Sequence, residues 1–178
     1  LLGSRSMIRM YDERGEYLQF NCINDGTAFV VDACDLEVVG DYKWRAMDNP
    51  SRFVRYVGRM EGSKTVLLHR DVMCPPLALT VDHRDKDTFN NRRYNLRVCT
   101  IGQNLMNRHN FKHTASGFRG VYGGKTGRWY AVISIGDQNK KLSLGGFDSA
   151  EAAARAWDAE AFARRGEFAQ LNFPNDLS

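Results

Sequence analysis

Three polar side chains near the middle of the chain have the types and spacing to do chemistry on a phosphodiester bond. Asp82 and His83 end an apolar run at 77–81, and Asn104 follows a second apolar run at 96–99. A carboxylate and an amide oxygen suit a hard divalent cation such as Mg²⁺. A histidine with an ordinary pKa can be neutral at physiological pH and accept a proton. Two strands and a helix that bring the three together would make a metal site with a base beside it.

The same residue types also have ordinary structural explanations. An Asp-His pair at the end of a strand is usually part of a turn, and the asparagines of the following loop are common turn formers. Asn104 could simply cap or bond locally. The spacing alone therefore leaves both a metal site and a polar loop open.

Short elements must position these residues. Upstream, residues 7–66 predict a β-rich lead-in, with strands at 17–23, 27–31 and 53–60 and a short helix at 35–42. A helix or strand at 67–73 is ended by two prolines, which cannot donate a hydrogen bond. Thr100 and Gln103 form a capping-box pattern, so a helix should start near Ile101 with Asn104 in its first turn.

Residues 117–173 have a different texture. Three β-type runs at 118–122, 128–135 and 140–144 are separated by glycine-bearing turns, one of them at 136–139, and predict an antiparallel meander. Asp148 and Glu151 predict the start of a helix with a mostly alanine face, and Gly166 predicts its end. One helix on a three-stranded sheet leaves the other face free, which antiparallel sheets tolerate.

Period-two alternation divides the middle strand of this meander between the two faces. The side chains predicted to face the helix are those of Trp129, Ala131, Ile133 and Ile135. Those predicted on the free face are Arg128, Tyr130, Val132 and Ser134, joined by Lys141 and Ser143 of the next strand.

Composition limits the class of protein. Of 178 residues, 43% are hydrophobic and 26% charged, as in a globular domain, and the net charge of +4 permits a polyanionic partner without demanding one. No apolar run reaches the ~20 residues of a membrane span, and no secretory signal is seen. The four cysteines lie far apart, which argues against cysteine-ligated zinc and predicts buried free thiols in a reducing cytoplasm.

The run VDHRDKDTFNNRRYNLRVCTIGQNLMN at 81–107 resembles the HNH endonucleases of phages and mobile introns. Their DH pair, asparagine-rich loop, NL before the second strand and QN on the helix are all present. The resemblance implies a ββα-metal fold with Asp82 and Asn104 as ligands of one Mg²⁺ or Mn²⁺ ion and His83 as the general base. It also implies that Asn95 holds the loop and orients the histidine.

Upstream, Trp44 and the Leu68-His69-Arg70 triplet also match the HNH pattern. This match makes His69 a catalytic candidate. For Arg70 it suggests a phosphate contact or structural support.

A second resemblance covers residues 118–173, which are similar to the plant APETALA/ethylene-response-factor DNA-binding domain. The matching stretches are 119–121 (RGV), 144–148 (LGGFD), 152–158 (AAARAWD) and 171–173 (LNF). In that family the sheet enters the major groove, so the resemblance implies DNA contacts from Arg119, Tyr122, Arg128, Tyr130, Ser134, Lys141 and Ser143. Ser143 stands where tryptophan is common and Ser134 where arginine is common, so the plant target sequence should not be carried over.

Both resemblances together predict an α+β protein in three parts: an HNH endonuclease domain with its lead-in at 7–107, a linker at 108–116, and a DNA-binding domain at 117–173. The expected function is a site-specific homing endonuclease that hydrolyses double-stranded DNA. It is expected to nick as a monomer, without organic cofactor or membrane, in the cytoplasm of a bacterial host. The alternative is a non-catalytic, sequence-specific DNA-binding regulator with a degenerate HNH centre.

Overall fold

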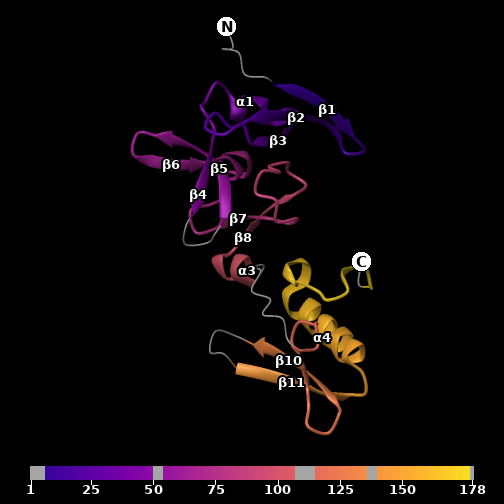
Figure 1. Cartoon of the computed structure of the whole chain (residues 1–178). Helices are drawn as coiled ribbons and strands as arrows, with labels where there is room; N and C mark the ends of the chain where they lie inside the picture. The colour runs from indigo at the N-terminus through magenta and orange to yellow at the C-terminus, as the bar shows by residue number, and fades with distance from the viewer. Residues whose placement is uncertain (1–6, 50–53, 107–114, 136–139, 177–178) are drawn as a thin grey trace. The chain divides into compact units, whose positions relative to one another are not determined.

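The computed structural model describes residues 7–49, 54–106, 115–135 and 140–176, and the chain divides into two compact units, Leu1–Ile101 and Gly102–Ser178 (Figure 1). The fold class is α+β, because the described sheets are antiparallel and the described helices are few and mostly short. The predicted linker at 108–116 and the predicted turn at 136–139 lie largely or wholly outside the described residues. No described helix is long and apolar enough to cross a membrane.

The first unit begins with a three-stranded antiparallel sheet in the order β1-β2-β3. Its strands are β1 (Ile8–Asp12), β2 (Gly15–Asn21) and β3 (Ala28–Asp32), and they are followed by a 3-10 turn, Ala33–Asp35, and helix α1 (Leu36–Val39). Every residue of β1 is exposed, whereas β2 and β3 alternate between the core and the surface. This alternation explains why β2 and β3 were predicted from the sequence and β1 was not.

A second antiparallel sheet, β4-β5-β6, leads into the central motif. The strands are β4 (Arg45–Asn49), β5 (Val54–Glu61) and β6 (Lys64–Leu67). Helix α2 (Leu68–Met73), the strand pair β7 (Thr80–His83) and β8 (Leu96–Cys99), and helix α3 (Ile101–Met106) follow in that order. The apolar run predicted as a strand from residue 77 is therefore strand only at its end, and Leu77 is fully exposed.

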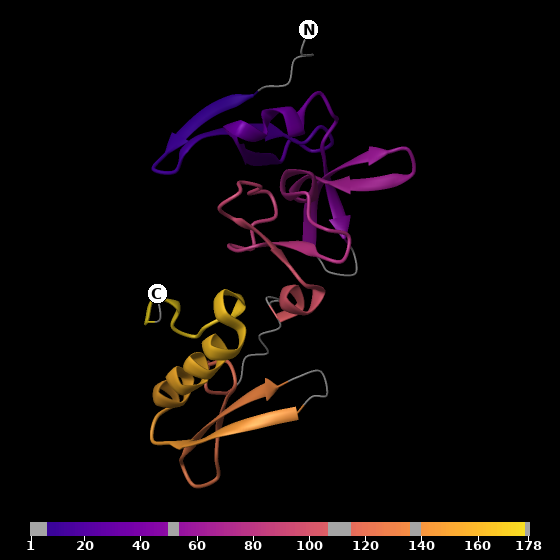
Figure 2. The ribbon, with the colours of Figure 1, turned by 180° about the vertical axis from the view of Figure 1, so that it is seen from behind.

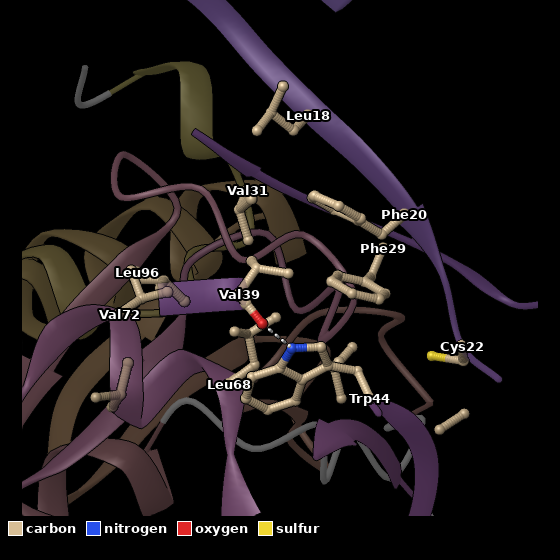
Figure 3. Packing of buried hydrophobic residues seen from close by; sticks show 13 residues of the cluster. Leu18, Phe20, Cys22, Phe29, Val31, Val39, Trp44, Leu68, Val72 and Leu96 are labelled. Atoms are coloured by element: carbon tan, nitrogen blue, oxygen red, sulfur yellow. Dashed lines mark hydrogen bonds between the residues drawn. The ribbon is translucent and has the colours of Figure 1, made fainter. Parts of the chain in front are cut away.

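Aromatic and branched side chains from all three sheets of this unit and from α1 and α2 form its core (Figure 3). The rings of Phe20 and Phe29 stack across β2 and β3 with centroids 5.6 Å apart. Trp44 is fully buried, and its indole N–H donates to the carbonyl oxygen of Val39 at 2.9 Å, so its one polar atom is satisfied. This core holds the strands on which the central polar residues lie.

The second unit is a three-stranded antiparallel sheet with one long helix on one face, as Figure 1 and Figure 2 show. After α3, which begins at the boundary between the units, its elements are β9 (Val121–Gly123), β10 (Trp129–Ile135), β11 (Lys140–Phe147) and α4 (Ala150–Arg165), followed by 3-10 turns at Gly166–Phe168 and Pro174–Asp176. Ala153, Ala154 and Ala161 are fully buried against the sheet, because small side chains allow the helix to lie close to it.

The ends of α4 agree with the prediction except at its cap. Gly166 ends the helix with a positive φ of 52°, as predicted. Ser149, and not Asp148, is the N-cap residue, and its side chain accepts a hydrogen bond from the backbone N–H of Ala152 at 3.1 Å. The prediction of four buried thiols is wrong in part, since Cys34 and Cys74 are exposed, although all four cysteines are free.

Candidate nucleic-acid interface

The carboxylate predicted to bind a metal ion is held by an arginine. Asp82 on β7 lies directly opposite Arg97 on β8. The guanidinium donates to Oδ2 of Asp82 from Nη2 at 2.7 Å and from Nε at 2.9 Å, and both side chains are buried. Arg97 therefore supplies the positive charge that a cation would otherwise supply, and the donor set does not fit a bound divalent ion.

The two histidines form a buried aromatic cluster with Tyr56. His69 on α2 meets His83 edge to face, with ring centroids 5.1 Å apart, and Tyr56 lies 5.5 Å from His69. Burial lowers the pKa of His69 to about 3, helped by the nearby His83 and by Arg70. Burial also lowers the pKa of His83, although its hydrogen bond to Asn91 opposes that shift. Both rings are therefore neutral at physiological pH.

His83 contacts a different asparagine from the one predicted. Its Nε2 lies 3.3 Å from Oδ1 of Asn91. Asn95 instead joins the two sides of the loop, because its Oδ1 accepts from the backbone N–H of Asp85 at 2.9 Å and its Nδ2 donates to the carbonyl of Asn90 at 2.8 Å. The NN pair in the sequence was the signal for Asn91, but nothing in the spacing showed which asparagine faces the ring.

The asparagine-rich loop is anchored to the first sheet. The backbone N–H of Val30 donates to Phe89 at 3.0 Å, and that of Asn91 donates to Val30 at 2.8 Å. Arg92 is buried, donates from Nε to Asp32 at 2.8 Å, and also binds the carboxylate of Asp12. Since these partners are about 60 and 80 residues away along the chain, no local sequence pattern could have indicated them.

The remaining predicted residues of this part are Arg70 and Asn104, which lie in different helices. Arg70 donates from Nη1 to the carbonyl of Leu79 at 3.3 Å, which is a structural contact. Asn104 lies in α3 within the second unit, whereas Asp82 and His83 lie in the first, so its part in a shared site stays a prediction. Within the described ranges, no group of three or more His, Cys, Asp or Glu side chains could hold a metal ion.

In the second unit, the sheet presents one face that α4 does not cover. Burial along β10 alternates, with Ala131 and Ile133 buried toward the helix and Tyr130 and Ser134 exposed. The strand register places the residues of this free face in cross-strand rows: Tyr122, Tyr130 and Gly146 in one, Val132 with Ser143 in the next, and Ser134 with Lys141 in the third. We call this surface the open face.

The two arginines predicted to contact DNA are engaged with protein groups. Arg128 donates from Nη2 to the carbonyl of Gly146 at 2.8 Å, and its Nη2 lies 3.5 Å from Oδ1 of Asp148. Arg119 donates from Nη2 to Oε1 of Gln170 at 2.8 Å, and burial lowers the pKa of its guanidinium. Arg128 thus lies at the edge of the open face, whereas Arg119 connects β9 to the C-terminal segment.

Comparison with known proteins supports the second resemblance. No protein-family model matches the chain. The chain is similar to plant ethylene-responsive transcription factors. It is 44% identical over 59 residues to ethylene-responsive transcription factor ERF016 of Arabidopsis thaliana, a match that covers 33% of this chain and 27% of that protein. It is 41% identical over 61 residues to ERF018 of the same plant, covering 34% and 31% respectively.

Another relative is named for binding a responsive element. Dehydration-responsive element-binding protein 1B of rice, Oryza sativa, is 50% identical over 56 residues, which are 31% of this chain and 26% of that protein. The chain therefore spans between about a quarter and a third of the length of these relatives. The similarity supports the ethylene-response-factor part of the sequence interpretation and lends no support to the HNH part.

These relatives overturn three predictions. The prediction of a metal-dependent endonuclease is wrong, because two of these similar proteins are named as transcription factors and the third as an element-binding protein, and such proteins are DNA-binding regulators and not hydrolases. The prediction of a Mg²⁺ or Mn²⁺ cofactor is wrong on the same comparison, and the pairing of Asp82 with Arg97 agrees with that correction. The prediction of a bacterial cytoplasm is wrong because the relatives are transcription factors of plants, which are nuclear and not bacterial.

Proposed function

We propose that the chain is a sequence-specific, double-stranded DNA-binding regulator that reads its site with the open face. The observation that carries the proposal is the sheet β9-β10-β11, which has α4 on one face and leaves Tyr122, Tyr130 and Lys141 exposed on the other. A twisted antiparallel ribbon fits the major groove of B-DNA, where each base pair presents a distinct pattern of donors and acceptors. The similarity to proteins named as transcription factors supports the same conclusion.

The chemistry of the open face suggests a role for each side chain. Lys141 supplies a charge for a phosphate, and Arg128 extends that contact at the end of the sheet. Ser134 and Ser143 carry hydroxyl groups that can donate to or accept from base edges. Arg119 acts indirectly, because its bond to Gln170 fixes the strand that carries Tyr122.

For the first unit, we propose a binding role without catalysis. Its antiparallel pair β7-β8 is followed along the chain by α3, which begins at the boundary between the units, and this is the element order of a degenerate ββα centre. The proposed domains span 7–107 and 117–173 and are joined by a linker at 108–116. We propose that the chain acts as a monomer. A second contact joined to the first by a linker raises overall affinity through effective concentration.

Selection of bound duplexes from a randomised DNA library tests the proposal. The full chain should enrich one motif, and Ser143→Ala should relax or change the preference at a single position of that motif. Arg164→Gln on α4 is the matched control and should return the wild-type motif, because α4 lies on the opposite face of the sheet. Failure to enrich any motif would refute the proposal, as would an equal change in the α4 variant.

A further inference from the structure

Two tyrosines stand side by side on the open face. Tyr122 of β9 and Tyr130 of β10 are directly opposite each other in the strand register. The exposed fractions of these two residues are 52% and 37%, so neither is buried in the core. Neither hydroxyl group has a protein hydrogen-bond partner within the described part of the chain.

Two glycines flank the second ring, Gly124 in the turn after β9 and Gly146 in β11. A Cβ atom added at Gly124 would lie 2.4 Å from Cε2 of Tyr130, and one added at Gly146 would lie 3.3 Å from Cε1. The ring of Tyr130 therefore occupies the space that a side chain at position 124 would need, and neither glycine has a side chain of its own there. As a result, neither of these two positions places a side chain over the ring, whose nearest side-chain neighbours on the face are Tyr122 and Arg128.

The charges around the tyrosine pair favour a polyanion. The strands β9, β10 and β11 contain no Asp or Glu, and Lys141 lies on the open face two cross-strand rows from Tyr130, whereas Lys140 is paired with Ile135 and faces the other side. Arg128 lies against Gly146, with its Nε 3.4 Å from the position of an added Cβ there. The carboxylate of Asp148 is close to this guanidinium and is strongly exposed, so it lies at the rim of the surface.

We infer that Tyr122 and Tyr130 form a stacking site for unpaired nucleobases, so that the open face binds single-stranded nucleic acid as well as duplex DNA. Bases in a duplex hide their faces in the stack and expose only their edges, whereas unpaired bases can stack on aromatic side chains. An exposed aromatic pair on a basic sheet is suited to the second kind of contact. The inference stands on this geometry and does not depend on a specific duplex site.

An ordinary structural explanation exists for the same pair. Aromatic residues directly opposite each other on neighbouring strands stabilise a sheet by contact alone. That explanation predicts that Ala variants lose thermal stability but bind nucleic acid as before. The stacking site predicts a loss of affinity that depends on the presence of bases, and this difference defines the experiment.

The test measures binding of the full chain to three fluorescein-labelled single strands by anisotropy. The strands are an oligothymidylate, the oligouridylate of equal length, and an abasic deoxyribose-phosphate strand of equal length. Wild type should bind at least one base-bearing strand about tenfold more tightly than the abasic strand. Tyr122→Ala and Tyr130→Ala should each reduce that advantage about tenfold, while Tyr130→Phe should keep it within about twofold.

Lys141→Gln is the matched control for charge. It should weaken binding to all three strands by the same factor, since each has the same phosphates. Equal affinity for abasic and base-bearing strands in wild type would overturn the inference, as would Ala variants that bind like wild type. Tyr130→Phe keeps the ring and so separates loss of stacking from misfolding. The anisotropy assay uses no duplex, so a negative result in it would not affect the proposal of duplex recognition. Equally, a failure to select a duplex motif would not affect the result for single strands.

Discussion

Replacing Lys141 with glutamine should weaken duplex binding and flatten its salt dependence. Lys141 is exposed and lies opposite Ser134 on the open face, and it has no ion-pair partner among the described residues. One phosphate contact contributes a slope of about −0.9 in a plot of log affinity against log salt concentration. If the two proteins converge at about 1 M salt, the same slope gives a loss of about eightfold at about 0.1 M salt.

The assay is fluorescence anisotropy with a selected duplex, repeated over a series of NaCl concentrations. Wild type and Lys141→Gln are compared with Arg164→Gln, which removes one charge from α4 without touching the open face. The reasoning predicts a flatter slope for Lys141→Gln only. A wild-type slope in Lys141→Gln would show that this amine contacts no phosphate. Equal flattening in Arg164→Gln would show that net charge matters and position does not.

Three predictions concern stability and are read from chemical denaturation. Gly120→Ala should lower the free energy of unfolding by about 2 kcal/mol or more, because the new Cβ would lie 2.1 Å from Nε1 of Trp157 and the backbone φ is +70°. Gly127→Ala is the control: its φ is +76° but its Cβ would meet no atom, so it should lose only the backbone strain of about 1–2 kcal/mol. Arg92→Met should lower the denaturation midpoint by leaving the carboxylates of Asp12 and Asp32 without their partner, and an unchanged midpoint would show that this ion-pair network does not hold the loop. His69→Leu should reduce the loss of stability in acid. The pKa of His69 is about 3 in the folded chain and 6.5 ordinarily, so as the pH is lowered between these values the unfolded chain takes up the proton first, and the free energy of unfolding decreases by up to about 1.4 kcal/mol per pH unit. An equally steep decrease in the variant would contradict this.

The sequence predicted the second unit well because its strands are amphipathic and its turns are rich in glycine. Alternation along β10 correctly separated Ala131 and Ile133 from Tyr130 and Ser134. The end of α4 followed from Gly166, whereas the cap was misplaced by one residue because aspartate and serine are both good caps. Alternation could not show that Gly124 and Gly146 lie beside the ring of Tyr130, because this depends on how the neighbouring strands and the turn after β9 align.

The first unit was harder to predict, because its contacts are long-range. A fully exposed strand such as β1 has no alternation to detect. The pairing of Asp82 with Arg97 depends on how β7 and β8 align across a long loop, and the spacing alone does not define that register. The same isolated motif therefore suggested a metal ligand where the structure has a buried ion pair.

The central claim is that the open face reads a DNA sequence. The most direct measurement is the ratio of dissociation constants for a selected duplex and a shuffled duplex of equal composition, taken at fixed salt for wild type and for a variant combining Tyr130→Ala, Ser143→Ala and Lys141→Gln. The account predicts a ratio of about 10³ or more for wild type and a ratio near one for the variant. A ratio near one in wild type, or an undiminished ratio in the variant, would contradict it.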